Sequence, residues 1–405
     1  MKKEEGDLKK LFKTLSKGGN SPNTFPPNPG SRPSRGDRES LGSQGYDWGI
    51  IISVIFLPAI GMLMVYSTSS VYALEKFGDA SYFLKRQAIY LFIGFTVMIV
   101  LMKLDYQILK RFVYPAYIMG LLILCLVLVP GLGKEIGGAR RWINLGPGSF
   151  QPAEVAKFLL VFYLAYSLMK KKEKMDTFLV GFVSHVLIVG VYIILILLEP
   201  DFGMSVVLLV LLFGMLFIGG VNIKYIAVSG IISILFLSWA VMSHGYRMNR
   251  IMAFLNPWKD PLGSGYQTVQ SFMAFSLGGV TGSGLGNSSQ KLLFLPEAHT
   301  DFIFSIIGEE LGLIGVISII IGFGFLMIRG LRVALRVTDL FGCYLVFGCI
   351  MLITLQAGIN MAVAVGLFPT KGLTLPFISY GGTSLISSLA AMGIVLSVSR
   401  AGVKK

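Results

Sequence analysis

Long apolar runs dominate this chain and leave few choices of fold. A helix needs about 20 apolar residues to cross the ~30 Å hydrocarbon core of a bilayer, and five continuous runs approach that length. These runs are Trp48–Tyr66, Ala88–Met102, Tyr114–Val129, Phe178–Leu198 and Met204–Ile218. Further spans are expected to start near Pro152, Lys224, Phe302, Asp339 and Leu375. Because the runs do not alternate, they indicate helices rather than barrel strands. We therefore predict an all-α polytopic membrane protein with about ten transmembrane helices.

The basic residues set the expected orientation. With both termini in the cytoplasm, the short inner loops hold clusters such as Lys170, Lys171, Lys172 and Lys174, as the positive-inside rule requires. The loops on the outer side carry more cations than that rule favours, which indicates an anionic ligand there. No cleavable signal peptide precedes the first span, so that span is expected to serve as its own insertion signal.

The chain divides into a tail and a membrane domain. Residues 1–45 are rich in Pro, Gly, Ser, Asn and basic residues and are predicted to form a disordered cytoplasmic tail. Within it, "LKKLFKTLSK" has the spacing of a short amphipathic helix on anionic lipid, although a plain solvated tail fits equally well. Residues 46–400 form the predicted transmembrane domain and 401–405 a short cytoplasmic C-terminus. Three cysteines lie in apolar runs, where no disulfide or zinc site is indicated.

One long outer loop, near residues 244–300, is predicted to be ordered and to lie against the membrane, because it keeps aromatic and apolar residues. Its "GGVTGSGLGNSSQK" stretch has no Gly-Lys-Ser/Thr step and no preceding strand, which excludes a phosphate-binding nucleotide loop. The glycines instead favour tight turns or close backbone approach.

The stretch "FLPEAHTDFIFSIIGEELG" follows that loop and concentrates acidic residues beside an apolar run. Glu297, His299 and Asp301 are expected at the outer end of a span, at the edge of the lipid rather than in it. Asp301 is placed either to cap the helix or to serve a functional site. Glu309 lies eight residues further along the helix, where it would either line the same cavity as Asp301 or pair with a cation of a neighbouring helix. Glu310 could form such a pair as well.

Two other stretches place polar groups at the same boundary. "GGARRWINLGPGSFQPAEVAKF" holds Arg140, Arg141 and Trp142, which suit diphosphate binding or headgroup anchoring. In the same stretch, Glu154 and Lys157 share a helix face, as a self-neutralising pair would. "FPTKGLTLPFISYGGTS" places Lys371 and Ser379 on irregular backbone, which lipid does not tolerate unless it lines a cavity.

These three stretches resemble the signatures of the SEDS (shape, elongation, division and sporulation) family, over about Tyr46 to Arg400. The pattern is more similar to the division branch than to the elongation branch. The resemblance implies a peptidoglycan glycosyltransferase that polymerises lipid II on the outer face of the bacterial cytoplasmic membrane, at the division septum. It also implies a class B penicillin-binding protein and other division proteins as partners, with membrane lipids around the bundle and no nucleic acid.

The resemblance further marks Asp301 as the catalytic base, and the chemistry agrees, because an attacking hydroxyl needs a carboxylate within reach. The diphosphate leaving group needs positive charge from Arg, Lys or a divalent cation such as Mg²⁺ or Mn²⁺, which the sequence does not specify. The predicted substrate-binding residues are Arg140, Arg141, Trp142, Glu154, Lys157, Glu297, His299, Lys371 and Ser379. Three alternatives stay open: a lipid II flippase, a non-catalytic division scaffold and the elongation-type role. No internal repeat supports the first, and the clustered Arg–Trp and Asp residues have no use in the second.

Overall fold

The computed structural model describes residues 45–136, 139–144, 149–242, 245–290, 297–370 and 372–401. The predicted disordered tail and the last four residues of the chain lie outside this range, apart from residue 45, so those two predictions stay predictions. Residues 45–401 pack as one unit, and the following description concerns that unit.

Within the described residues, nine helices are long and apolar enough to cross a membrane, and the apolar part of α9 is a tenth candidate. This confirms the all-α polytopic fold with about ten spans. The spanning helices are α3 (Trp48–Phe77), α4 (Tyr82–Lys103), α5 (Leu109–Leu128), α6 (Pro152–Lys170), α7 (Ser184–Leu198), α8 (Phe202–Gly219), α9 (Ile223–Met242), α12 (Ile303–Arg336), α13 (Leu340–Ala364) and α14 (Gly382–Ala401). One-turn 3₁₀ segments η1 (Tyr106–Ile108) and η2 (Lys172–Lys174) precede α5 and follow α6, and a π-helix, η3 (Phe178–Val183), leads into α7.

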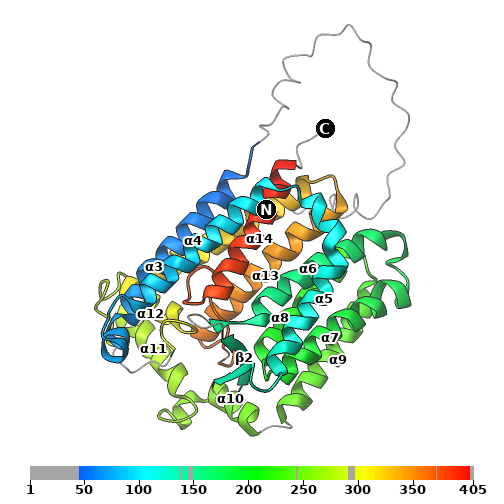
Figure 1. Ribbon diagram of the computed structural model, residues 1–405. Helices are drawn as coiled ribbons and strands as arrows, with labels where there is room; N and C mark the ends of the chain where they lie inside the picture. Colours follow the sequence, from blue (N-terminus) through cyan, green and yellow to red (C-terminus); the bar gives the residue numbers. More distant parts are fainter. Residues whose placement is uncertain are drawn as a thin grey trace, which may run out of the picture. The chain divides into compact units, whose positions relative to one another are not determined.

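Helices α13 and α14 form the centre of the bundle (Figure 1). Helix α13 contacts α6, α8, α12 and α14, and α14 packs mainly against α4. Both are more buried than the outer helices α4 and α5, which present large apolar side chains to the lipid. The segment that connects α13 to α14 therefore starts and ends on helices that are packed on several sides.

Helix α12 is interrupted at Gly312, whose φ of 64° and ψ of −162° are not helical. A segment of the long loop fills the break, because Leu313 N donates to Gly279 O at 3.0 Å and Ser283 N donates to Glu309 O at 2.9 Å. A side chain at position 312 would collide with the amide nitrogen of Gly282, so only glycine fits there. The 24 residues after the break, about 36 Å of helix, are long enough to span the core alone. Residues 303–311 therefore form a separate, short half-helix.

Two local structures differ from the simple run of spans. A small antiparallel sheet, in the order β1 (Gly133–Ile136), β2 (Ala139–Asn144) and β3 (Ser149–Phe150), lies between α5 and α6. The span expected from Leu375 begins instead at Gly382, because residues 372–381 stay irregular before α14. Inside the long loop, the structure forms α10 (Gly245–Leu255), η4 (Pro257–Lys259) and α11 (Tyr266–Gly278), and α11 packs on α12.

The helix ends define two faces of the bundle. One, the terminal face, holds the start of α3 and the end of α14, with Asp47 paired to Arg329 at 2.7 Å and Lys110 paired to Asp339 at 3.3 Å. The other, the site face, holds the small sheet, the start of α12 and residues 372–381. Which of these faces the cytoplasm is a prediction from the charge distribution.

Candidate active site

Asp301 lies just before the short half-helix of α12, residues 303–311, on the site face. Its backbone carbonyl accepts a hydrogen bond from Asn360 Nδ2 of α13 at 2.9 Å, and the same amide donates to Leu373 O at 2.6 Å. One α13 side chain therefore joins the Asp301 segment to the irregular stretch before α14.

Ser379 provides a second link between these segments. Its hydroxyl donates to Thr300 O and accepts from Leu375 N at 2.8 Å, while Tyr380 N donates to His299 O at 2.9 Å. The Ser379 side chain is buried, and its hydrogen is already engaged. Ser379 thus positions the residues on either side of Asp301, and a direct contact of its hydroxyl with substrate stays a prediction.

Arg141 extends from β2 toward Asp301. Its guanidinium donates from Nε to Glu199 O at 3.4 Å and from Nη2 to Pro200 O, and it lies 3.8 Å from Asp201 Oδ2. Gly372 lies between this arginine and Asp301. A Cβ built there would be 3.3 Å from Asp301 Oδ2 and 3.7 Å from Arg141 Nη1. A carboxylate and a guanidinium therefore face the same small space, next to a residue without a side chain.

The electrostatics of this space follow from burial. Burial, reinforced by the negative charge of Glu297, raises the pKa of Asp301 from 3.8 to about 7, against the opposing effect of Arg141. Burial and neighbouring Asp201 likewise raise the pKa of Glu199 to about 8. Glu199 therefore holds a proton at neutral pH and adds no charge, while Asp301 titrates in the range where a general base works best.

Glu297 and His299 surround Asp301 but differ in exposure. Glu297 is exposed, adopts a φ of 57°, and accepts from Thr300 Oγ1 at 2.8 Å. His299 packs in an aromatic cluster, with ring centroids 4.9 Å from Phe83 and 5.8 Å from Tyr380. Burial lowers the pKa of His299, so it is neutral at pH 7. Glu297 and His299 therefore shape the turn that carries Asp301. Their contact with substrate stays a prediction.

Glu154 and Lys157 lie deeper, fully buried at the start of α6. The Lys157 ammonium lies 2.5 Å from Glu154 Oε2 and also donates to Gln356 Oε1 of α13. Gln356 Nε2 then donates to Glu154 Oε1 at 3.2 Å and to Thr374 O at 3.1 Å. The predicted self-neutralising pair is confirmed, and its network reaches the stretch beside Asp301.

The remaining predicted substrate-binding residues are not seen to face Asp301. Arg140 points to the exposed side of the sheet, where its Nε lies 3.3 Å from Glu135 Oε2, and Trp142 is half-buried on β2. Arg140 pairs with Glu135 and Trp142 pairs with Lys134, so Arg141 is the extra residue of a β-bulge, and the bulge directs its side chain separately from that of Arg140. Lys371 lies outside the described residues. Only Arg141 of the predicted diphosphate ligands is therefore seen to face Asp301.

Glu309 does not extend the site inward, as the helical spacing had suggested. Its carboxylate accepts from Ser288 Oγ and from Ser289 N at 2.7 Å. The physical reason is the break at Gly312, which brings the glycine-rich loop against this helix turn. Glu309 therefore anchors that loop. Glu310 accepts instead from Ser67 Oγ of α3 at 2.6 Å.

The sequence reasoning missed four polar residues of the site: Asn360, Glu199, Asp201 and Arg250. Asp201 Oδ2 is buried and has no hydrogen-bond partner within the described residues. Arg250 donates to Thr370 O at 2.9 Å and opposes the rise in the pKa of Asp301. The sequence did carry a signal for two of these four residues, because Glu199 and Asp201 are acids at the end of an apolar run. Asp301 was selected by the same pattern, an acid at the boundary of an apolar run.

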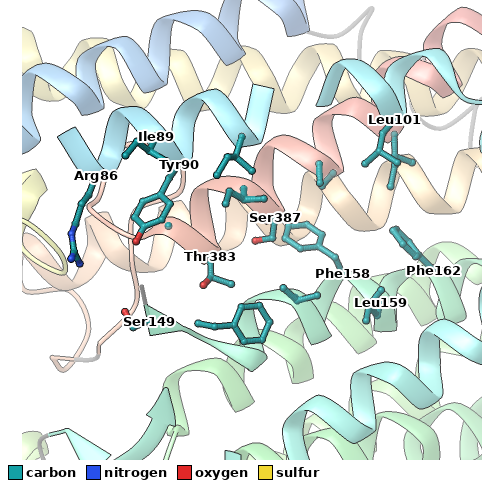
Figure 2. Close-up of a pocket in the computed structure, with 18 of the residues that line it drawn as sticks. Arg86, Ile89, Tyr90, Leu101, Ser149, Phe158, Leu159, Phe162, Thr383 and Ser387 are labelled. Atoms are coloured by element: carbon teal, nitrogen blue, oxygen red, sulfur yellow. The ribbon is translucent and has the colours of Figure 1, made fainter. Parts of the chain in front are cut away.

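A groove of about 730 Å³ opens between α4, α6 and α14 (Figure 2). Arg86, Tyr90, Ser149 and Thr383 lie toward one end, and Leu101, Leu159 and Phe162 toward the other. The polar end adjoins the site, because Thr383 Oγ1 accepts from Gln151 N at 3.1 Å and residues 372–381 lead from Asp301 to α14. The groove thus joins a polar head on the site face to a long apolar body.

A helical bundle of this kind, with a carboxylate and an arginine together on one face and an apolar groove on the same side, defines a polytopic membrane protein. The profile of the cell cycle protein family FtsW/RodA/SpoVE matches residues 47–403, and the chain belongs to that family. The predicted resemblance to the SEDS proteins is thereby confirmed.

Curated relatives support the division branch. The chain is 46% identical over 356 residues to a protein of Geobacter sp. (strain M18) named "Probable peptidoglycan glycosyltransferase FtsW", covering 88% of this chain and 97% of the relative. It is 41% identical to "Stage V sporulation protein E" of Bacillus subtilis (strain 168), covering 87% and 96%.

Solved structures share the fold. One is described as "Structural coordination of polymerization and crosslinking by a peptidoglycan synthase complex"; it has a TM-score of 0.74 and 33% identity, covering 89% of this chain and 99% of that one. The crystal structure of the rod shape determining protein RodA of Thermus thermophilus has a TM-score of 0.66 and 30% identity, covering 89% and 98%.

Proposed function

We propose that this chain is a peptidoglycan glycosyltransferase that polymerises lipid II during septal cell-wall synthesis, with its active site on the extracytoplasmic side. The observation that carries the proposal is the meeting of Asp301 and Arg141 beside Gly372, on the same face of the bundle as the polar end of the apolar groove. The family, and relatives named peptidoglycan glycosyltransferase, support the same reaction class.

Asp301 acts as the general base in this reaction. Its carboxylate takes the proton of the acceptor sugar hydroxyl as that oxygen attacks the anomeric carbon of the donor. The bond from that carbon to the diphosphate oxygen breaks, and the diphosphate leaves with the electron pair. Because attack and departure occur on opposite sides, the configuration inverts. A diphosphate is a stable anion, so one base suffices and no paired acid is needed.

Arg141 stabilises the departing charge. Two of the five N–H donors of its guanidinium are held by the carbonyls of Glu199 and Pro200, which fix its plane, and Nη1 remains on the Gly372 side. A positioned guanidinium with spare donors suits a diphosphate better than a mobile ammonium does.

The groove suits the polyprenyl tail. It is lined by apolar side chains of α4, α6 and α14, and its polar end lies on the site face. A lipid-linked donor could thus keep its tail in the bilayer while its diphosphate reaches Arg141. This explains why charged residues gather at the membrane edge rather than within it.

A divalent cation fits this site only in part. Across the described residues, no three His, Cys, Asp or Glu side chains converge as a complete metal site. Asp201 Oδ2, which has no hydrogen-bond partner there, and the carboxylate of Asp301 could still bind Mg²⁺ or Mn²⁺ together with substrate phosphates, since Mg²⁺ often uses one or two carboxylates and phosphate oxygens. Such an ion would supply positive charge for the leaving group.

Reconstitution distinguishes this function from the alternatives. Purified protein in liposomes with lipid II should form glycan strands. Movement of lipid II across the bilayer without polymer would favour a flippase, and neither activity would favour a scaffold.

The pH dependence should report Asp301. A base works only when deprotonated, so polymerisation should fall about tenfold per pH unit below about 7, the pKa of Asp301, and level off above it. Initial rates between pH 5 and 9, in a range where the protein stays folded, check this. A flat profile would exclude a titrating base with this pKa.

Arg141→Ala should weaken lipid II use by about 1.5–3 kcal/mol, the range for a hydrogen bond to a charged group. Arg140→Ala is the matched control, since its exposed side chain pairs with Glu135 and does not face Asp301. The measurement is polymerisation at limiting lipid II. Equal rates for Arg141→Ala and the wild type would leave headgroup anchoring as the role of Arg141.

Partnership with a class B penicillin-binding protein is the remaining part of the proposal. The structural neighbour described as a synthase complex supports it. The only long loop predicted on the outer side holds α10 and α11, which offer a surface for a partner's outer domain. We expect co-purification in mild detergent and faster polymerisation in the complex. Repeated isolation of the chain alone, at unchanged rate when the partner is added, would contradict this.

A further inference from the structure

A second cavity, of about 330 Å³, lies on the terminal face between the inner ends of α5 and α6 and the π-helix η3. Its walls bring together three tyrosines and three lysines: Tyr114, Tyr163, Tyr166, Lys170, Lys171 and Lys174. Helix α6 starts beside the Asp301 site and ends at this cavity, 19 residues or about 28 Å away. The cavity is therefore separate from the active site and unused by the mechanism above.

The cavity is rich in positive charge that the described residues do not neutralise. Glu173 is the one acidic residue in its lining, and no salt bridge of Lys170, Lys171 or Lys174 is found within the described part of the chain. Lys171 Nζ donates to Ser184 Oγ at 2.9 Å, and Lys170 lies 5.8 Å over the ring of Tyr166. Burial, and to a lesser extent the nearby charge of Lys170, lower the pKa of Lys171.

Contacts within the protein hold the side chains of the cavity walls in place. Tyr114 packs edge-on against Tyr166, with centroids 5.8 Å apart. At the base, His185 Nδ1 lies 2.7 Å from Gly181 O, which assigns the ring hydrogen to Nδ1. Nε2 then accepts from Ser167 Oγ at 3.0 Å, and the Ser167 hydrogen is used. Donors to a ligand must therefore come from the lysines and the tyrosine hydroxyls, which are the groups that bind phosphate.

Apolar side chains continue outward from this cavity. Leu179 on η3 is 70% exposed and Ile118 on α5 is 54% exposed, both on the lipid-facing surface of the spanning helices. A ligand with a phosphate in the cavity could therefore lay an acyl chain along the adjacent helices.

We propose that this cavity binds the phosphate-bearing headgroup of an anionic membrane lipid, held by Lys170, Lys174 and the tyrosine hydroxyls. Basic pockets between membrane helices commonly bind such headgroups, and each basic residue near a charged membrane surface strengthens binding about fivefold. The lipid would neutralise the lysines and hold the inner ends of α5, α6 and α7 together. This inference does not depend on the proposed glycosyltransferase activity.

Lys172 provides a matched control. It lies in the same short loop and carries the same charge, but it does not line the cavity. The experiment titrates detergent-purified protein with short-chain phosphatidylglycerol and reads affinity from the rise in unfolding temperature. Parallel titrations use short-chain phosphatidylcholine and inorganic phosphate.

Wild type and Lys172→Gln should bind phosphatidylglycerol alike. Lys174→Gln should bind about fivefold more weakly, and Lys170→Gln with Lys174→Gln about 25-fold more weakly. Equal loss in Lys172→Gln would overturn the proposal in favour of general attraction to a basic surface. Equal stabilisation by inorganic phosphate would overturn the lipid assignment, and equal stabilisation by phosphatidylcholine would overturn the anion requirement. If the double variant does not fold, the single Lys174→Gln variant, at an exposed position, decides.

Discussion

Asp301→Asn should lower polymerisation of lipid II by about 10²- to 10⁴-fold, the contribution of a positioned general base. Asn matches the shape of Asp and caps a helix about equally well, so a capping role alone predicts almost no effect. The difference between these two outcomes is large enough for a single assay of glycan-strand formation by the purified variant.

Asp301→Asn should lower activity without lowering thermal stability. The pKa of Asp301 is raised from 3.8 to about 7, so the free energy of unfolding is highest below pH 3.8, falls as the pH rises from 3.8 to about 7, and is level above that. Asn stays neutral throughout. Asp301→Asn should therefore unfold at the same temperature as the wild type or higher above pH 7. A variant that is both inactive and less stable would indicate a structural role.

Asp79→Asn is the matched control. Asp79 lies between α3 and α4 on the site face, paired at 2.8 Å with exposed Lys85, and is not part of the Asp301 site. It should polymerise normally. Full activity in Asp301→Asn would transfer the role of base to another carboxylate, and Glu297 is the next candidate.

The spans were predictable because apolar length is a local property of the sequence. Runs such as Phe178–Leu198 needed no knowledge of their neighbours, and the structure forms η3 and α7 there. The interruption of α12 was not predictable in this way. Gly312 adopts its conformation because Gly279 to Gly284, some 30 residues away, occupies the break, and the same loop takes up the Glu309 carboxylate through Ser289.

The site was predictable in its chemistry but not in its geometry. Asp301 stands out as an acid at the start of an apolar run, and Arg141 as a cation beside a tryptophan in the stretch between two spans. Their meeting depends on Asn360 and Ser379, which are neutral residues with no sequence signal of their own. The same limit applies to Arg140 and Arg141. They are adjacent in sequence, and only the strand geometry of β2 separates the one that faces the site from the one that faces solvent.

Lys157→Met should be the most destabilising of the single substitutions considered. Lys157 and Glu154 are each 1% exposed and 2.5 Å apart, and removal of the lysine leaves a carboxylate without its partner in the apolar interior. Breaking such a buried pair costs about 3–5 kcal/mol. Because the network continues through Gln356 to Thr374, the stretch beside Asp301 should loosen and polymerisation should fall with stability.

Lys85→Met tests the same chemistry at an exposed site. The Lys85 and Asp79 side chains are 67% and 40% exposed, and loss of such a pair costs at most about 1 kcal/mol. Thermal unfolding in detergent, with the two variants and the wild type prepared alike, should place Lys157→Met well below the other two.

The double variant Glu154→Gln with Lys157→Met separates a structural from a substrate-binding role of Lys157. Replacing both charges removes the unpaired ion, and exchanges of this kind are often neutral or stabilising. The amide introduced by Glu154→Gln could still hydrogen-bond Gln356, which lies 3.2 Å from the present carboxylate. Recovery of both stability and polymerisation would mean that the pair only supports the fold. Recovery of stability with polymerisation still lost would mean that one of the two charges acts on lipid II, against the complete burial of both residues in this structure.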